Sequence, residues 1–280
     1  MRNFIAACLA VLLLTVAVPG GVRGEGQGSD QVFTGEQIQA VTGNADSYLR
    51  QLVRLDGAFY GLTNDAAVLR WDGKQAAPEL FCQLTDTPQT SAAAYEDVPL
   101  EQRAVWEDTV SFLAPGEATL WGVNVFSGKI GTLSAQGIKW SGTELDMSPM
   151  RPLGSKWPLR LVDAFVRGNS LYVYAAHDNV DYPHNRYDLF AFDLTTGTSA
   201  TLDIKNAQGL CPFQGDDLLL LHYQEGSWVF RTFGLTSQEL SDEPYASFEA
   251  PYDSPVGGLA YDAQGDRLYM AAEGQIWRSD

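Results

Sequence analysis

The segment AAHDNVDYPHNRYD, residues 175–188, gathers two histidines, three aspartates and two tyrosines in one short stretch. Imidazole and carboxylate groups can bind zinc, but His177 and His184 lie seven positions apart on a segment that a proline interrupts. A calcium loop places acids at every second position, whereas Asp178 and Asp181 are three apart. We therefore expect no metal and no cofactor here, and we interpret the segment as a long loop.

A long loop on a rigid scaffold is a common place for a binding surface. Tyrosine, histidine and tryptophan add flat contact area that combines an apolar ring with a polar atom. Two tryptophans also flank a polar segment with two prolines, residues 141–156. The residues predicted to contact a ligand are His177, Asp178, Asp181, Tyr182, His184, Tyr187, Trp140 and Trp157.

Acidic residues raise a catalytic alternative. Glycoside hydrolysis needs two or three carboxylates roughly 5 to 10 Å apart. Asp108, Asp163 and Asp262 are the candidate catalytic carboxylates, because they fall near the expected innermost strands of a repeat that runs through the chain. With 35 acids in the chain, such placements also arise by chance. Neither a Gly-x-Ser-x-Gly nucleophile motif nor a glycine-rich phosphate loop occurs in the sequence.

A repeat organises the rest of the chain. Five segments consist of an apolar strand, a turn with glycine and a second strand. The turn glycines are Gly57, Gly116, Gly168, Gly215 and Gly265, separated by 59, 52, 47 and 50 residues. This spacing is close to the roughly 40 to 50 residues of a four-stranded propeller blade. We predict an all-β chain: a β-propeller of about five four-stranded blades, possibly open or truncated.

The segment AFDLTTG, residues 191–197, resembles the repeat of bacterial YVTN and quinoprotein-like propellers. In those families an Asp before a Thr-Gly turn closes the hairpin between the third and fourth strands, and Asp193, Thr196 and Gly197 match. The tryptophan that follows the turn in the quinoprotein group is absent. The resemblance therefore implies a propeller fold and transfers no cofactor site.

The N-terminus reads as a secretory signal over residues 1–24, with an arginine followed by an apolar run that is too short to span a bilayer. A retained membrane anchor is the alternative. We assign residues 25–44 to an N-terminal segment and 45–280 to the propeller. The last repeat ends at its third strand, so residues 30–43 could supply a closing strand. Alternatively, the chain is the front part of a longer protein.

The charge balance excludes some partners. The chain has 18 basic and 35 acidic residues, and removing residues 1–24 leaves 16 and 35, a net charge of −19. Such a surface repels nucleic acid and anionic lipid. Cys82 and Cys211 could form a disulfide in an exported protein or remain buried thiols.

Together these patterns predict an extracytoplasmic bacterial binding module that presents loops to a peptide, a glycan or a partner protein. A carbohydrate-active hydrolase or lyase is one alternative. The other is an N-terminal sensor or accessory region of a larger surface receptor or solute-binding protein.

Overall fold

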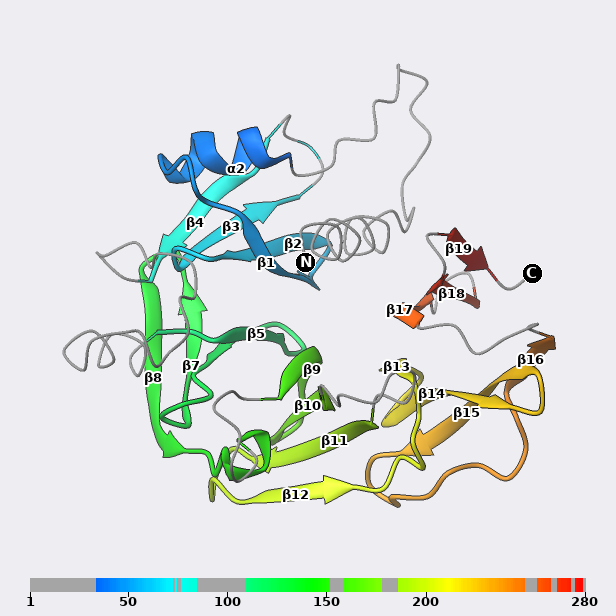
Figure 1. Ribbon diagram of the computed structural model, residues 1–280. Helices are drawn as coiled ribbons and strands as arrows, with labels where there is room; N and C mark the ends of the chain where they lie inside the picture. The colour runs from blue at the N-terminus through cyan, green and yellow to red at the C-terminus, as the bar shows by residue number, and fades with distance from the viewer. Residues whose placement is uncertain are drawn as a thin grey trace. The chain divides into compact units, whose positions relative to one another are not determined.

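The chain is an all-β protein built from β-propeller blades (Figure 1). The computed structural model describes residues 34–72, 74, 77–84, 109–151, 159–177, 186–249, 256–262, 266–272 and 275–278. Their strands form five antiparallel sheets, each a meander in which neighbouring strands follow one another in the sequence. The chain divides into two compact units.

The larger unit, residues 28–180 and 189–201, contains most of three four-stranded sheets. The first sheet comprises β1 (Leu49–Leu55), β2 (Ala58–Thr63), β3 (Ala67–Trp71) and β4 (Glu79–Gln83). The second comprises β5 (Phe112–Pro115), β6 (Leu120–Val123), β7 (Lys129–Ser134) and β8 (Gly137–Glu144), followed by the 3-10 helix η1 (Ser148–Met150). The third comprises β9 (Arg160–Arg167), β10 (Ser170–His177), β11 (Arg186–Asp193) and β12 (Ser199–Leu202).

The smaller unit, which includes the chain from Leu202 onward, contains the other two sheets. The fourth sheet comprises β13 (Gly209–Pro212), β14 (Asp217–Gln224), β15 (Ser227–Gly234) and β16 (Ala246–Glu249). The fifth comprises β17 (Val256–Asp262), β18 (Arg267–Ala272) and β19 (Gln275–Arg278). The prediction that the last repeat ends at its third strand is confirmed.

Four of the five glycine turns predicted from the sequence join the first and second strands of the first four sheets, and Gly265 lies outside the described residues. Gly57, Gly168 and Gly215 adopt positive φ angles of 76°, 56° and 60°. Glycine is favoured there because in a left-handed conformation a Cβ atom would come too close to the adjoining backbone carbonyl of the same chain segment. The need for positive φ at a turn is a local property of the sequence, so these glycines reveal the repeat without knowledge of the fold.

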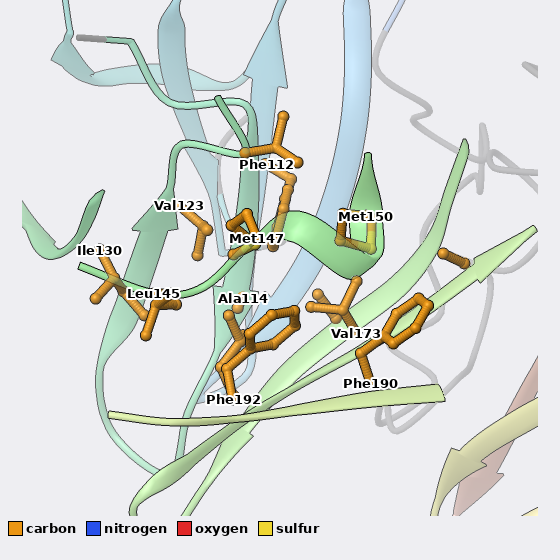
Figure 2. Close-up of a cluster of buried hydrophobic side chains, with 14 of the residues drawn as sticks. Phe112, Ala114, Val123, Ile130, Leu145, Met147, Met150, Val173, Phe190 and Phe192 are labelled. Carbon is orange, nitrogen blue, oxygen red and sulfur yellow. The ribbon is translucent and has the colours of Figure 1, made fainter. Parts of the chain in front are cut away.

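Apolar side chains fill the space between neighbouring sheets. In the larger unit, a cluster between the second and third sheets includes Phe112, Ile130, Met147, Phe190 and Phe192 (Figure 2). Another joins the first sheet to the second, and a third joins the two sheets of the smaller unit. Each sheet therefore hides a neighbour's apolar face, as in propeller blades.

Part of the segment expected as a closing strand is a helix instead. Residues Gly35–Thr42 form α2, and the capping box of Thr34 and Gln37 stabilises its start. Ile38 of α2 packs with Leu69, Phe59 and Trp71 of the first sheet. No helix among the described residues is long and apolar enough to cross a membrane. Both Cys82 and Cys211 are buried thiols.

Two tight turns hold the connection between β8 and η1. Asp193 Oδ1 accepts hydrogen bonds from the N–H groups of Thr195 and Thr196 at 2.8 and 2.7 Å, which confirms the predicted turn between a third and a fourth strand. The carbonyl of Gly197, where the turn ends, accepts a bond from the N–H of Asp146 at 2.7 Å.

Asn124 forms the same kind of turn between β6 and β7, because its Oδ1 accepts from the N–H groups of Phe126 and Ser127 at 2.8 and 2.9 Å. The carbonyl of Gly128 accepts from the N–H of Leu145 at 2.8 Å. The backbone of residues 144–146 therefore lies against turns from two different sheets.

Candidate functional site

The first strands of three sheets share an irregularity near their beginning. In β1, β9 and β17 one extra residue interrupts the pairing with the second strand: Arg50, Val162 and Gly257. Each lies five positions before the last paired residue of its strand. Such a β-bulge bends the strand and redirects side chains, and bulges are frequent beside binding sites.

The remaining two sheets show a related pattern of backbone bonds. Val123 pairs with Phe112, and its carbonyl also accepts from the N–H of Ser111 at 2.7 Å. Leu221 is likewise opposite Gly209 and accepts from the N–H of Gln208 at 2.7 Å. In each of these two sheets, two successive residues at the start of the first strand thus face one residue of the second strand. The beginning of the first strand is therefore irregular in all five sheets. We call the end of each sheet at which its first strand begins the first-strand end of that sheet.

Hydrogen bonds fix the first-strand end of the first sheet on both sides of Arg50. After it, the Gln51 amide bridges to the backbone of Leu113 in β5, donating through Nε2 to the carbonyl at 2.9 Å and accepting from the N–H at 2.6 Å. Before it, the backbone N–H of Tyr48 donates to Asn64 Oδ1 at 2.7 Å. The exposed side chains of Tyr48 and Arg50 thus project from a fixed backbone.

A buried carboxylate lies beneath that backbone. Asp65 is 3% exposed and accepts hydrogen bonds from three side chains. Asn44 Nδ2 donates to Oδ2 at 3.0 Å and Ser47 Oγ donates to Oδ1 at 3.0 Å, while the Thr63 hydroxyl also donates to Oδ1. The network connects the segment before β1 with the turn between β2 and β3.

In the third sheet, the first-strand end brings Asp163 next to the bulged Val162. Val162 is 40% exposed, and Asp163 is partly exposed. Within the described part of the chain, the Asp163 carboxylate accepts one hydrogen bond, from the N–H of Ala164 at 2.8 Å. Burial raises the pKa of Asp163 to about 6, because one donor does not replace the lost hydration of the charged form.

The loop singled out in the sequence leaves the sheet at this same end. It joins β10 to β11 as predicted, and β10 ends where the antiparallel β9 begins. In the other sheets the corresponding connections are shorter, namely residues 64–66, 124–128, 225–226 and 273–274, against 178–185 here. The longest of these connections and the Val162 bulge therefore belong to one end of one sheet.

The predicted site residues fall in different places. His177 is the last residue of β10 and Tyr187 is the second residue of β11, and both are partly exposed. Trp140 lies in β8 and packs partly buried against the cluster between the first and second sheets. Asp262 ends β17 in the smaller unit. The predicted residues outside the described part of the chain are Asp108, Trp157, Asp178, Asp181, Tyr182 and His184.

Sequence reasoning missed Tyr48, Arg50 and Val162. Arg50 lies in the run LRQLVRL, which alternates imperfectly and carries no turn residue. A bulge depends on the register of both strands, so the first strand alone gives no signal for it. The Asn-Asp pair at 64–65 was a visible turn signal that could have indicated a fixed end of the first sheet.

The Asp163→Asn substitution is expected to stabilise the protein at neutral pH. A carboxyl whose folded pKa exceeds the unfolded value of about 3.9 makes the folded state less stable as pH rises through that interval. The penalty is complete above pH 6 and absent near pH 4. With partial exposure discounted, we expect a gain of about 1 to 2 kcal/mol at pH 7.5 and almost none at pH 4.

Urea unfolding at the two pH values measures this difference. Asp193→Asn is the opposite control, because backbone N–H groups of Thr196 and Thr195 lower the pKa of Asp193. That variant should lose stability at pH 7.5. A gain for Asp163→Asn that is equal at both pH values would contradict the electrostatic cause.

No family model matches the sequence, and no curated protein matches it. Among solved structures, the Dos1 propeller covers 80% of this chain and 53% of its own, with 13% identity and a TM-score of 0.46. The Nup133 β-propeller domain of Vanderwaltozyma polyspora covers 84% and 72%, with 12% identity and a TM-score of 0.44.

The extracellular domain of the putative one component system BT4673 from B. thetaiotaomicron covers 87% of this chain, with 13% identity and a TM-score of 0.44. The present chain spans 31% of that domain's length, and about half of the Dos1 propeller's. These likenesses concern the fold alone.

Proposed function

We propose that the protein is an exported binding module whose ligand contacts the first-strand end of the third sheet. One observation carries the proposal: β10 and β11 are joined by the longest second-to-third-strand connection, residues 178–185, at the end of the sheet where Val162 forms a bulge. The packed sheet holds both ends of this connection in place. A ligand would therefore meet a long connection on a packed sheet, the arrangement typical of repeat-protein binding sites.

The chemistry of this end favours a ligand with both apolar and hydrogen-bonding groups. Val162 supplies exposed apolar surface, while His177 and Tyr187 supply rings with polar atoms. Peptides, glycans and protein surfaces all present such groups. The N-terminal signal pattern of residues 1–24 supports export, and the ligand would then be met outside the cytoplasm.

A carbohydrate-active hydrolase is the second candidate, and Asp163 is the observation that favours it. A carboxyl with a pKa of about 6 keeps its proton at mildly acidic pH, where it can act as a general acid. The mechanism also needs a second carboxylate roughly 5 to 10 Å away.

The test replaces residues 178–185 with the dipeptide Asn-Gly, which forms tight hairpins. Wild type and variant are applied to oligosaccharide and peptide arrays. Binding present in the wild type should fall at least tenfold in the variant, with the melting temperature retained. A matched control changes the Glu225–Gly226 turn to Asn-Gly and should bind normally.

Unchanged binding by the shortened variant would refute the proposed surface. Cleavage of an arrayed oligosaccharide by the wild type, lost in Asp163→Asn, would establish the hydrolase instead.

A further inference from the structure

A cluster of aromatic and polar side chains lies on the surface of the smaller unit. The Phe213 ring, which follows β13, contacts Tyr245 before β16 and Tyr261 in β17, with ring centroids 4.9 and 4.5 Å away. Both tyrosine hydroxyls donate hydrogen bonds to Oδ1 of Asp266, at 2.9 and 2.6 Å. Gln214 Nε2 donates to the Tyr261 hydroxyl oxygen at 2.8 Å. We call these five residues the tyrosine–carboxylate cluster.

The cluster presents a fixed negative charge. The hydrogen bonds from Tyr261 and Tyr245 lower the pKa of Asp266, so its carboxylate is ionised at neutral pH. Partial burial and the bond to Asp266 raise the pKa of Tyr245 to about 12, so that hydroxyl keeps its proton. Asp266 also has a positive φ of 47°, which fixes its direction at the turn before β18.

Part of this cluster is open to solvent. Tyr245 is 40% exposed and Asp266 is exposed. Oδ1 of Asp266 accepts both tyrosine bonds, whereas Oδ2 accepts none from the residues that the structure describes. The site therefore combines an accessible aromatic ring with an ionised carboxylate oxygen that still has its hydrogen-bonding capacity.

The surroundings are acidic. Asp216, Asp242 and Glu243 lie in the same short segments as Gln214 and Tyr245, and all three are exposed. The guanidinium of Arg231 donates to the backbone carbonyls of Ser241 and Asp242. The complementary partner of such a surface is positively charged, and the chain's net charge of −17 acts in the same direction.

We propose that the tyrosine–carboxylate cluster binds an arginine side chain of a basic partner protein. A guanidinium is planar, stacks on an aromatic face and donates charge-assisted hydrogen bonds to a carboxylate. Tyr245 offers the exposed ring and Asp266 offers Oδ2. The shared hydrogen bonds hold the two groups in place before binding, which reduces the entropy lost on association. The cluster shares no residue with the proposed site on the third sheet, so each of the two binding proposals can be tested without the other.

The experiment uses an acetylated and amidated Gly-Arg-Gly-Arg-Gly peptide titrated into the full chain at low salt, with heat or chemical shift as the readout. The same peptide with citrulline for arginine is the neutral control, because citrulline has nearly the same shape without the charge. We expect the arginine peptide to bind at least tenfold more tightly. Equal affinity for both peptides, or no measurable binding of either, would overturn the proposal.

Variants locate the binding to the cluster. Asp266→Asn removes the charge, and Tyr245→Ala removes the ring, so each should weaken arginine-peptide binding about tenfold. Tyr245→Phe keeps the ring and should cost threefold or less. Tyr48→Ala is the matched control, because Tyr48 is 43% exposed but lies in the larger unit. A loss in Tyr48→Ala as large as in Tyr245→Ala would refute the assigned site.

A gain-of-affinity variant guards against losses that arise from misfolding. Arg267 is an exposed cation directly after Asp266 in the chain, and its positive charge opposes the approach of a guanidinium to this surface. Arg267→Gln should therefore tighten arginine-peptide binding by two- to threefold. Weaker binding by this variant, with an unchanged melting temperature, would contradict the proposal.

Discussion

The Asp65→Ala substitution is expected to lower the free energy of unfolding by about 3 to 5 kcal/mol. Asp65 is buried and accepts hydrogen bonds from Asn44, Ser47 and Thr63. Alanine would leave the Asn44 amide and the buried Ser47 hydroxyl without this acceptor, whereas the Thr63 hydroxyl could still donate to the carbonyl of Ala67 at 3.2 Å. Each unsatisfied buried donor costs about 1 to 3 kcal/mol, less whatever the structure recovers by relaxation.

Asp65→Asn is the informative partner of this variant. An asparagine keeps one acceptor oxygen for Ser47 and Thr63 but directs an NH2 group toward the Asn44 amide. Asn44 would have to turn its own amide, and its Oδ1 would then give up the bond from the Asp46 N–H. We expect an intermediate loss of about 1 to 2 kcal/mol. Urea unfolding followed by circular dichroism measures both variants, and a loss below 1 kcal/mol for Asp65→Ala would show that water replaces the carboxylate.

Gly197→Ala is expected to cost about 3 kcal/mol through two separable causes. The first is the left-handed backbone, with φ at 76°. The second is overlap, because a Cβ atom at this position would occupy the space of the Glu144 carbonyl oxygen. That oxygen belongs to a backbone segment held by the hydrogen bond from the Asp146 N–H to the Gly197 carbonyl. It therefore cannot move away without weakening this bond.

The chain contains a matched control for this substitution. Gly57 has the same φ of 76°, but a Cβ atom there would meet nothing within 4 Å. Gly57→Ala should therefore show the backbone cost alone, about 1 to 2 kcal/mol. Thermal unfolding of the two variants separates the two causes. Equal losses of stability would mean that the backbone of residues 144–146 can shift to make room for the Cβ atom at no energetic cost.

The blade pattern was predictable because its signals are local. The first hairpin of each sheet needs a turn in which glycine is favoured. The strands on either side are apolar, so their ends can be recognised in the sequence. The sequence of the second repeat gives no comparable signal past Val125. The turn of Asn124 and Gly128 resembles that of Asp193 and Gly197, but it joins the second and third strands instead of the third and fourth.

The candidate sites were less accessible to sequence reasoning. The loop between β10 and β11 was found because its polar residues interrupt two apolar strands. The bulges were missed because they arise from the register between two strands. The tyrosine–carboxylate cluster joins Phe213, Tyr245 and Tyr261, which lie 32 and 16 positions apart with no shared spacing. The helix α2 had a visible signal, since Thr34 and Gln37 have the spacing of a capping box.

The helix α2 also bears on how the protein should be produced. Ile38 and Val41 shield Leu49, Leu52 and Trp71, apolar residues of the first sheet. An expression clone that starts at residue 45, where the repeat pattern begins, would expose this apolar surface of the first sheet to solvent and to other copies of the protein. Soluble material is best sought from clones whose first codon precedes Thr34.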